Sequence, residues 1–98
     1  QFTFYGFLPH KKGRETIFKA IAEAKVTSVF YESVHRIEKT LESLALLLES
    51  ERNVCITREL TKIHEECVRG SAEEVLAYFK VNKDKVRGEF VVIIEEKK

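Results

Sequence analysis

Methionine and tryptophan are absent from this chain of 98 residues, and proline occurs only once. The chain opens at Gln1, whereas an unprocessed gene product begins with methionine, and no signal-peptide pattern accounts for a removed leader. We therefore expect the chain to be a piece of a longer protein, with a function that is not complete within these residues.

Long apolar runs and an excess of one charge are also missing. No run approaches the roughly 20 apolar residues that a membrane span needs, so we expect no membrane partner. Seventeen basic and sixteen acidic residues leave a net charge of +1, so any nucleic acid must be attracted by a local patch. Hydrophobic residues make up 44% and charged residues 34% of the chain, which favours one ordered globular domain over disorder.

Cysteine is scarce, and the residues that bind metals are poorly spaced. Cys55 and Cys67 have no secretory context, which predicts two thiols in a reducing compartment, the cytoplasm. A zinc-protease helix needs a second histidine four positions after His64, where this chain has Val68. The four glycines stand alone, so they form no phosphate-binding loop. We predict no metal site.

Alternating apolar and helical patterns predict eight elements in the order β-α-β-α-β-β-α-β. Ser33 is expected to cap the second helix, and Ser71 with Glu74 forms a capping box for the third. The fold class is α/β (α+β), a two-layer sandwich with a mixed sheet of about five strands. The last strand is a continuous apolar run, typical of a strand central in its sheet or covered on both faces. The strands are expected at residues 2–7, 27–32, 53–57, 66–69 and 89–94, and the helices at about 14–24, 33–48 and 71–79.

The second helix carries more apolar surface than one contact with a sheet requires. Its main stripe is spaced by three and four residues, and Leu46 and Leu47 widen it. These two leucines either contact a further domain or a dimer mate, or they lie at a helix end tucked into the core.

Polar clusters follow the first three predicted strands, within residues 10–14, 31–36 and 58–65. If those strands are parallel, the clusters share the sheet edge where α/β proteins bind ligands. Alternatively, each cluster is a solvated loop whose ion pairs contribute about 0–1 kcal/mol. The first cluster has four potential cations in five residues, enough to neutralise about two to four phosphates. It has no interleaved aromatic residues, which favours a grip on the nucleic-acid backbone over base recognition.

Four segments carry a resemblance to a known family: residues 6–13 (GFLPHKKG), 30–36 (FYESVHR), 58–66 (RELTKIHEE) and 87–91 (RGEFV). In this order they resemble the C-terminal half of ribosomal RNA methyltransferases of the tetrapyrrole (corrin/porphyrin) methylase family. The resemblance runs from Phe2 to about Glu95. Val34 departs from it, because the family usually has proline there.

The resemblance implies a homodimeric enzyme that uses S-adenosylmethionine to methylate a cytidine 2′-hydroxyl of small-subunit ribosomal RNA. Residues 1–98 would be its C-terminal domain, inactive alone, because the donor-binding N-terminal domain with its glycine-rich loop is absent. The donor would lie between the two domains. The implied cofactor-binding residues are Tyr31, Glu32, Arg58, Glu59, Leu60, Thr61 and Lys62, with Thr61 at the adenosine. The implied RNA-binding residues are Lys11, Lys12, Arg14, His35 and Arg36. No catalytic residue is assigned.

Two other functions remain open. The same architecture could methylate a small macrocycle such as a corrinoid, although the basic loop with Lys11 and Lys12 argues against this. The chain could also be a stand-alone RNA-binding module that never meets a methyl donor.

Overall fold

A computed structural model describes residues 1–58, 67–83 and 88–98 of the chain. The described elements follow the predicted order and bear out the predicted α/β sandwich. They are β1 (Phe2–Phe7), α1 (Arg14–Glu23), β2 (Thr27–Ser33), α2 (Ile37–Leu47), β3 (Val54–Arg58), β4 (Cys67–Gly70), α3 (Ala72–Val81) and β5 (Glu89–Ile94).

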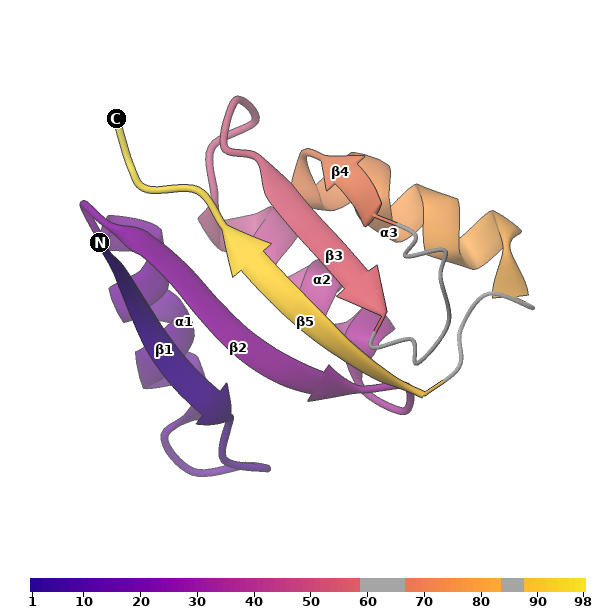
Figure 1. Ribbon diagram of the computed structural model, residues 1–98, viewed down its shortest axis with the longest axis horizontal. Coiled ribbons are helices and arrows are strands. Elements are labelled where there is room, and N and C mark those ends of the chain that lie inside the picture. The colour runs from indigo at the N-terminus through magenta and orange to yellow at the C-terminus, as the bar shows by residue number, and fades with distance from the viewer. Residues whose placement is uncertain (59–66, 84–87) are drawn as a thin grey trace.

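The five strands form one mixed sheet in the order β1-β2-β5-β3-β4. β1 and β2 are parallel, whereas β5 is antiparallel to both β2 and β3. Consequently β1, β2 and β3 all run in one direction, as their arrows show in Figure 1. Their last residues, Phe7, Ser33 and Arg58, lie at the same edge of the sheet, which we call the carboxyl edge. The sequence analysis required β1, β2 and β3 to be parallel for the three polar clusters to start at one edge, and these strands are parallel.

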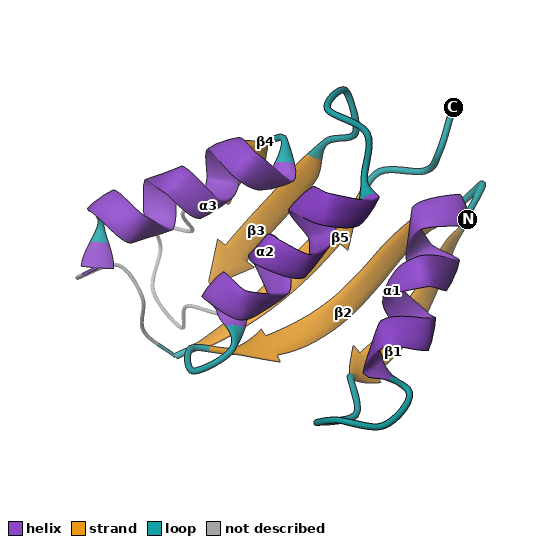
Figure 2. Cartoon of the chain, turned by 180° about the vertical axis from the view of Figure 1, so that it is seen from behind, coloured by secondary structure: helices purple, strands orange, loops and turns teal. Residues whose placement is uncertain are grey.

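All three helices cover the same face of the sheet (Figure 2). Alternate residues of β2 (Ser28, Phe30 and Glu32) are buried on this helix-covered face, and the residues between them are only partly buried. The opposite face, which we call the open face, carries no helix of the described residues. The core therefore lies between the sheet and the helices, and it includes Phe18, Ile21, Leu41, Leu44, Val75, Phe79, Phe90 and Val92.

β5 is the middle strand of the sheet, as its continuous apolar run indicated. Phe90, Val92 and Ile94 are buried under the helices, and Val91 and Ile93 alternate with them in partly buried positions. Apolar residues thus lie on both faces of this strand, although helices cover only one face (Figure 2).

The start of α2 differs from the prediction. Ser33 does not cap the helix, because its backbone still belongs to β2, where it pairs with Glu89. A turn closed by the Arg36 N–H, which donates to the Ser33 carbonyl, separates strand from helix, and α2 begins at Ile37. The capping box of α3 is confirmed: the Ser71 hydroxyl accepts from the Glu74 N–H, and the Glu74 carboxylate accepts from the Ser71 N–H.

The end of α2 is not tucked into the core, so that alternative is wrong. Leu46 is 88% exposed and Leu47 39% exposed, whereas Leu48 just beyond them is buried. The two leucines form a small exposed apolar area at the end of α2.

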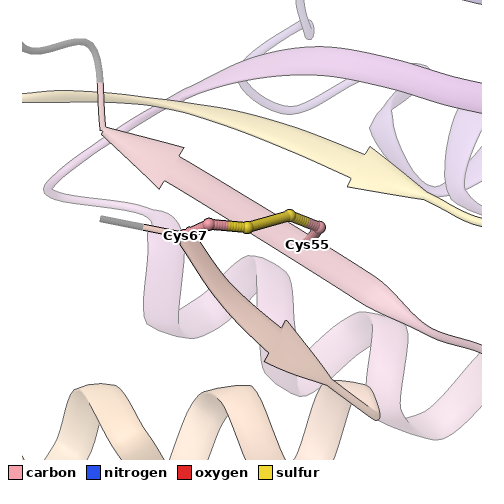
Figure 3. Close-up of a disulfide and its surroundings, with 2 residues drawn as sticks. All are labelled: Cys55 and Cys67. Atoms are coloured by element: carbon pink, nitrogen blue, oxygen red, sulfur yellow. A yellow bond between two sulfur atoms is a disulfide. The ribbon is translucent and has the colours of Figure 1, made fainter. Parts of the chain in front are cut away.

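Cys55 and Cys67 form a disulfide between β3 and β4 (Figure 3), so the expectation of two separate thiols is wrong. In the antiparallel pair, Cys55 faces Arg69 and Thr57 faces Cys67, which makes the two cysteines diagonal neighbours on one face. Their Cα atoms are 6.4 Å apart, within the range that a disulfide spans. The register of β3 against β4 brings the two sulfur atoms together.

Arg52 joins three elements at the sheet edge opposite the carboxyl edge. Its side chain is buried, and its guanidinium donates to the carbonyls of Ile21 and Ala22 at the end of α1 and of Glu95 after β5. It also pairs with Glu49 at 3.0 Å. A cation is favourable at a helix C-terminus, where unpaired carbonyls concentrate negative charge.

Candidate functional site

The carboxyl edge is the candidate site, because the segments after β1, β2 and β3 all start there. Neighbouring residues on a strand point to opposite faces, so the edge has two sides. Tyr31 is partly buried on the open face, whereas Glu32 is buried on the helix-covered face. The two residues predicted at the donor therefore diverge, and each face has its own set of side chains.

On the open face, Tyr31 packs between two phenylalanines of β1. The ring centroids of Phe4 and Phe7 each lie 5.2 Å from that of Tyr31. Residues three apart on a regular strand point to opposite faces, but β1 shifts register between Phe4 and Phe7, where Gly6 has φ 68°. This bulge brings both phenylalanines to Tyr31, and both remain more than half exposed. The result is an aromatic cluster (Phe4, Phe7 and Tyr31) at the carboxyl edge.

On the helix-covered face, Glu32 is held by three groups of this chain. Its carboxylate pairs with the guanidinium of Arg14 and accepts from the Thr40 hydroxyl and the Ser33 N–H. Arg14 also donates to the Thr40 hydroxyl and to the Pro9 carbonyl, and it lies over the Phe18 ring at 5.2 Å. The side chains of Arg14 and Glu32 are 13% and 4% exposed. This buried network fixes the loop after β1 against the start of α1, β2 and α2.

A groove of about 400 Å³ lies above this network, between the loop after β1 and the first turns of α1 and α2. Its basic rim consists of His10, Lys11, Arg36 and Lys39, with Glu15 as the one carboxylate lining it. None of Lys11, Arg36 and Lys39 forms an ion pair with another described residue. Three cations therefore face one cavity that has a single carboxylate, Glu15, and none of them is ion-paired within residues 1–58, 67–83 and 88–98.

The structure brings some predicted residues together and leaves others apart. Lys11 and Arg36 meet at the groove although 25 positions separate them, and Arg14 lies beneath them. Lys12 and His35 are exposed and do not line the groove. Glu59, Leu60, Thr61 and Lys62 lie outside the described residues, as does the side chain of Arg58, whose backbone ends β3. The predicted roles of all these residues remain predictions.

Two groove residues, His10 and Lys39, were not among the predicted site residues. A signal for Lys39 was available, because residues three apart on a helix share a face and Lys39 follows Arg36 by three. His10 stood in the basic loop, but nothing in the sequence indicated which of the loop's side chains turns toward α2.

Metal ligands and membrane spans were also sought in the described part of the chain. No group of three or more histidine, cysteine or acidic side chains there could hold a metal ion, and His64 lies outside it. Within the same residues, every helix is too short and too polar to cross a bilayer.

The chain is similar in sequence to several proteins named ribosomal RNA small subunit methyltransferase I, while no family model matches it. It is 41% identical over 95 residues to the protein from Bacillus subtilis (strain 168), covering 96% of this chain and 32% of that protein. It is 41% identical over 96 residues to the protein from Escherichia coli O157:H7, covering 97% of this chain and 34% of that protein. The chain thus spans about a third of the length of the curated relatives it matches.

Two solved structures that share this fold are tetrapyrrole methylases. Cobalt precorrin-4 methyltransferase matches with a TM-score of 0.67 at 12% identity, over 97% of this chain and 40% of that enzyme. Uroporphyrin-III C-methyl transferase from Thermus thermophilus, complexed with S-adenosyl homocysteine, matches with a TM-score of 0.62 at 21% identity, over 98% of this chain and 42% of that enzyme. At these identities the likeness establishes the fold alone.

Proposed function

We propose, from its homology to about a third of ribosomal RNA small subunit methyltransferase I, that this chain is the C-terminal domain of an S-adenosylmethionine-dependent RNA methyltransferase. The observation that carries the proposal is the 41% identity over nearly the whole chain to proteins of that name. The N-terminal domain, with most of the donor site, would belong to the same protein outside these 98 residues. Residues 1–98 by themselves should transfer no methyl group.

The acceptor in this proposal is the 2′-hydroxyl of a cytidine in small-subunit ribosomal RNA. S-adenosylmethionine, when bound, supplies an electrophilic methyl group on sulfur. The contribution of this chain is to form one wall of the cleft and to hold the RNA so that the hydroxyl oxygen is in line with that methyl group. Holding two reactants in such an orientation can provide about 7–11 kcal/mol of catalysis without a dedicated base.

The aromatic cluster at the carboxyl edge fits an adenosine group. Tyr31 offers a ring at the strand end that the resemblance places toward the donor, and Phe4 and Phe7 fix its orientation. Aromatic faces stack favourably on flat rings such as adenine, by about 0.5–1.5 kcal/mol beyond the area they bury. Glu32 then acts indirectly, since its hydrogen bonds to Arg14 and Thr40 hold the end of β2 in place.

A second candidate is methylation of a tetrapyrrole, which the fold of the solved structures favours. The identities argue for RNA, because they are 41% to the RNA enzymes and 12–21% to the tetrapyrrole enzymes. Replacing Lys11 and Lys12 together by alanine separates the two candidates. RNA methylation should weaken and become less sensitive to salt, whereas a macrocycle substrate should be little affected.

The decisive experiment uses the full-length protein that carries this chain, labelled S-adenosylmethionine, and small ribosomal subunits from cells that lack ribose methylation. Label recovered as 2′-O-methylcytidine is the expected result. Labelled RNA with a different modified nucleoside would keep the enzyme class and change the acceptor. Donor binding without any labelled RNA would move the proposal to the tetrapyrrole candidate.

The proposal includes a homodimer in the cytoplasm. Leu46 is nearly fully exposed, and β1 presents Phe2, Phe4 and Phe7 to solvent, which is apolar surface that a second copy would cover. Sedimentation of the full-length protein should give a dimer, and Leu46→Asp should weaken it if α2 is part of the interface. Sedimentation of the unaltered protein as a monomer alone would remove the dimer from the proposal.

A further inference from the structure

The basic groove between α1 and α2 is a cavity with a defined floor, rather than a scatter of surface lysines. Arg14, Thr40 and Phe18 form that floor, and the first two are locked by the buried carboxylate of Glu32. The volume of about 400 Å³ lies within the range of about 300–1,000 Å³ usual for ligand sites. The rim residues therefore belong to segments that the hydrogen bonds among Arg14, Glu32 and Thr40 hold together, and a specific ion site requires such fixed positions.

The charges at the groove select an anion. Arg14 is neutralised by Glu32, so the unbalanced charges are those of Lys11, Arg36 and Lys39 against the single carboxylate of Glu15. His10 adds a donor on the same rim. The groove also borders the N-terminal ends of α1 and α2, neither of which has a side-chain cap on its N–H groups. These helix ends add positive partial charge to a site that the side chains already make basic.

We infer that this groove binds a backbone phosphate of the RNA substrate, held by Lys11, Arg36 and Lys39 with His10 at the rim. The inference rests on the proposed function for the identity of the ligand as RNA. It adds His10 and Lys39 to the contact surface and places the phosphate on the helix-covered side of the carboxyl edge. The aromatic cluster occupies the open side, so the phosphate and the donor would lie on opposite faces of one sheet edge.

The arrangement has a direct consequence for the RNA. Arg36 immediately precedes α2 and Lys39 lies in its first turn, whereas Lys11 belongs to the loop after β1. The phosphate would therefore be held from two segments that Arg14 joins through its hydrogen bonds to Pro9 and Thr40. A phosphodiester held there anchors the strand at one point while the neighbouring nucleotide reaches around the edge. Backbone contacts of this kind fix register and carry no sequence information.

The test uses the full-length protein and measures its affinity for small ribosomal subunits as a function of salt. Lys39→Ala should reduce the slope of log affinity against log salt by about 0.7–0.9, the loss of one phosphate contact. Lys39→Arg should retain the slope, because it keeps the charge. The matched control is Lys25→Ala, an exposed lysine beyond the far end of α1, which should leave the slope unchanged. Thermal unfolding of each variant checks that it is folded.

The outcomes separate this inference from the proposed function. If the unaltered protein methylates RNA and Lys39→Ala leaves both affinity and slope unchanged, the groove is not a phosphate site and the enzyme proposal stands. If Lys39→Ala lowers the slope but no variant methylates RNA, the groove stands and the enzyme proposal falls. If the unaltered protein does not bind the subunits at all, both fall.

Discussion

The two ends of α1 each contact an arginine, partly buried at the start and buried at the end, but the two arginines have different kinds of partners. At the start of the helix, Arg14 pairs with the carboxylate of Glu32. Beyond its end, Arg52 donates to three main-chain carbonyls and also pairs with Glu49, whose side chain is partly exposed. An ion pair cancels the charge of Arg14 and leaves the surrounding cations to act on a ligand. The hydrogen bonds from Arg52 to carbonyls instead join the end of α1 to the segment after β5. The same side chain thus supports a binding surface at one end and closes the fold at the other.

The largest effect should come from Arg52→Ala. It leaves the carbonyls of Ala22 and Glu95 without the donor that Arg52 provides, whereas the Ile21 carbonyl keeps the N–H of Ala24. Each unsatisfied buried group costs about 1–3 kcal/mol. We expect a loss of about 4 kcal/mol in the free energy of unfolding, measured with urea. Arg69→Ala, at an exposed arginine of β4, should stay within about 0.5 kcal/mol of the unaltered protein. Equal effects of the two variants would show that the hydrogen bonds of Arg52 do not stabilise the fold.

Glu32→Gln should have the second largest effect. It keeps the shape of the side chain but leaves the charge of Arg14 without a carboxylate in a largely buried site, at a cost of about 2–3 kcal/mol. Adding Arg14→Met should recover part of that loss, because the unpaired charge is then gone. Urea unfolding of the two single variants and the double variant measures this coupling. Additive losses would mean that the two side chains contribute independently.

The smallest effect concerns Glu49. A hydrogen bond from its own backbone lowers the pKa of this carboxyl, burial opposes the shift, and the charge of Arg52 lowers the pKa further. A lowered folded-state pKa stabilises the fold above the unfolded value, and this contribution is lost as pH falls through the folded value. The urea midpoint of Glu49→Gln should therefore lie slightly below that of the unaltered protein at pH 7, and the difference should disappear in acid. In the Arg52→Ala background the difference at pH 7 should be smaller, because one of the causes of the lowered pKa is gone.

The fold was largely predictable because its signals are local and repeated. The alternation in residues 27–33, the apolar run of β5 and the capping box at Ser71 each identify one element without knowledge of the others. The start of α2 was not predictable in this way. Ser33 satisfies the rule for a helix cap, but its pairing with Glu89 of β5, 56 positions away, keeps it in the sheet.

The shared sheet edge was predictable from the sequence, but the pairing of side chains at it was not. Polar residues after the first three strands indicated an edge that those strands share, which the strand directions confirm. They could not indicate that Arg14, expected at the RNA, and Glu32, expected at the donor, would bind each other. That contact depends on the position of α1 relative to β2 in three dimensions, which the spacing of residues in the sequence does not specify. The role of Arg52 was missed for the same reason, since its partners are carbonyls that every residue possesses.

The bulge at Gly6 also bears on how the protein avoids aggregation. β1 is an edge strand with exposed phenylalanines, and a long flat edge of that kind recruits strands from other molecules. The register shift between Phe4 and Phe7 interrupts the row of hydrogen-bonding groups that such a strand would need. At the other edge, β4 has only four residues and ends at Gly70. Neither edge of this sheet offers an uninterrupted template, so the exposed aromatic surface can remain available for binding without nucleating fibrils.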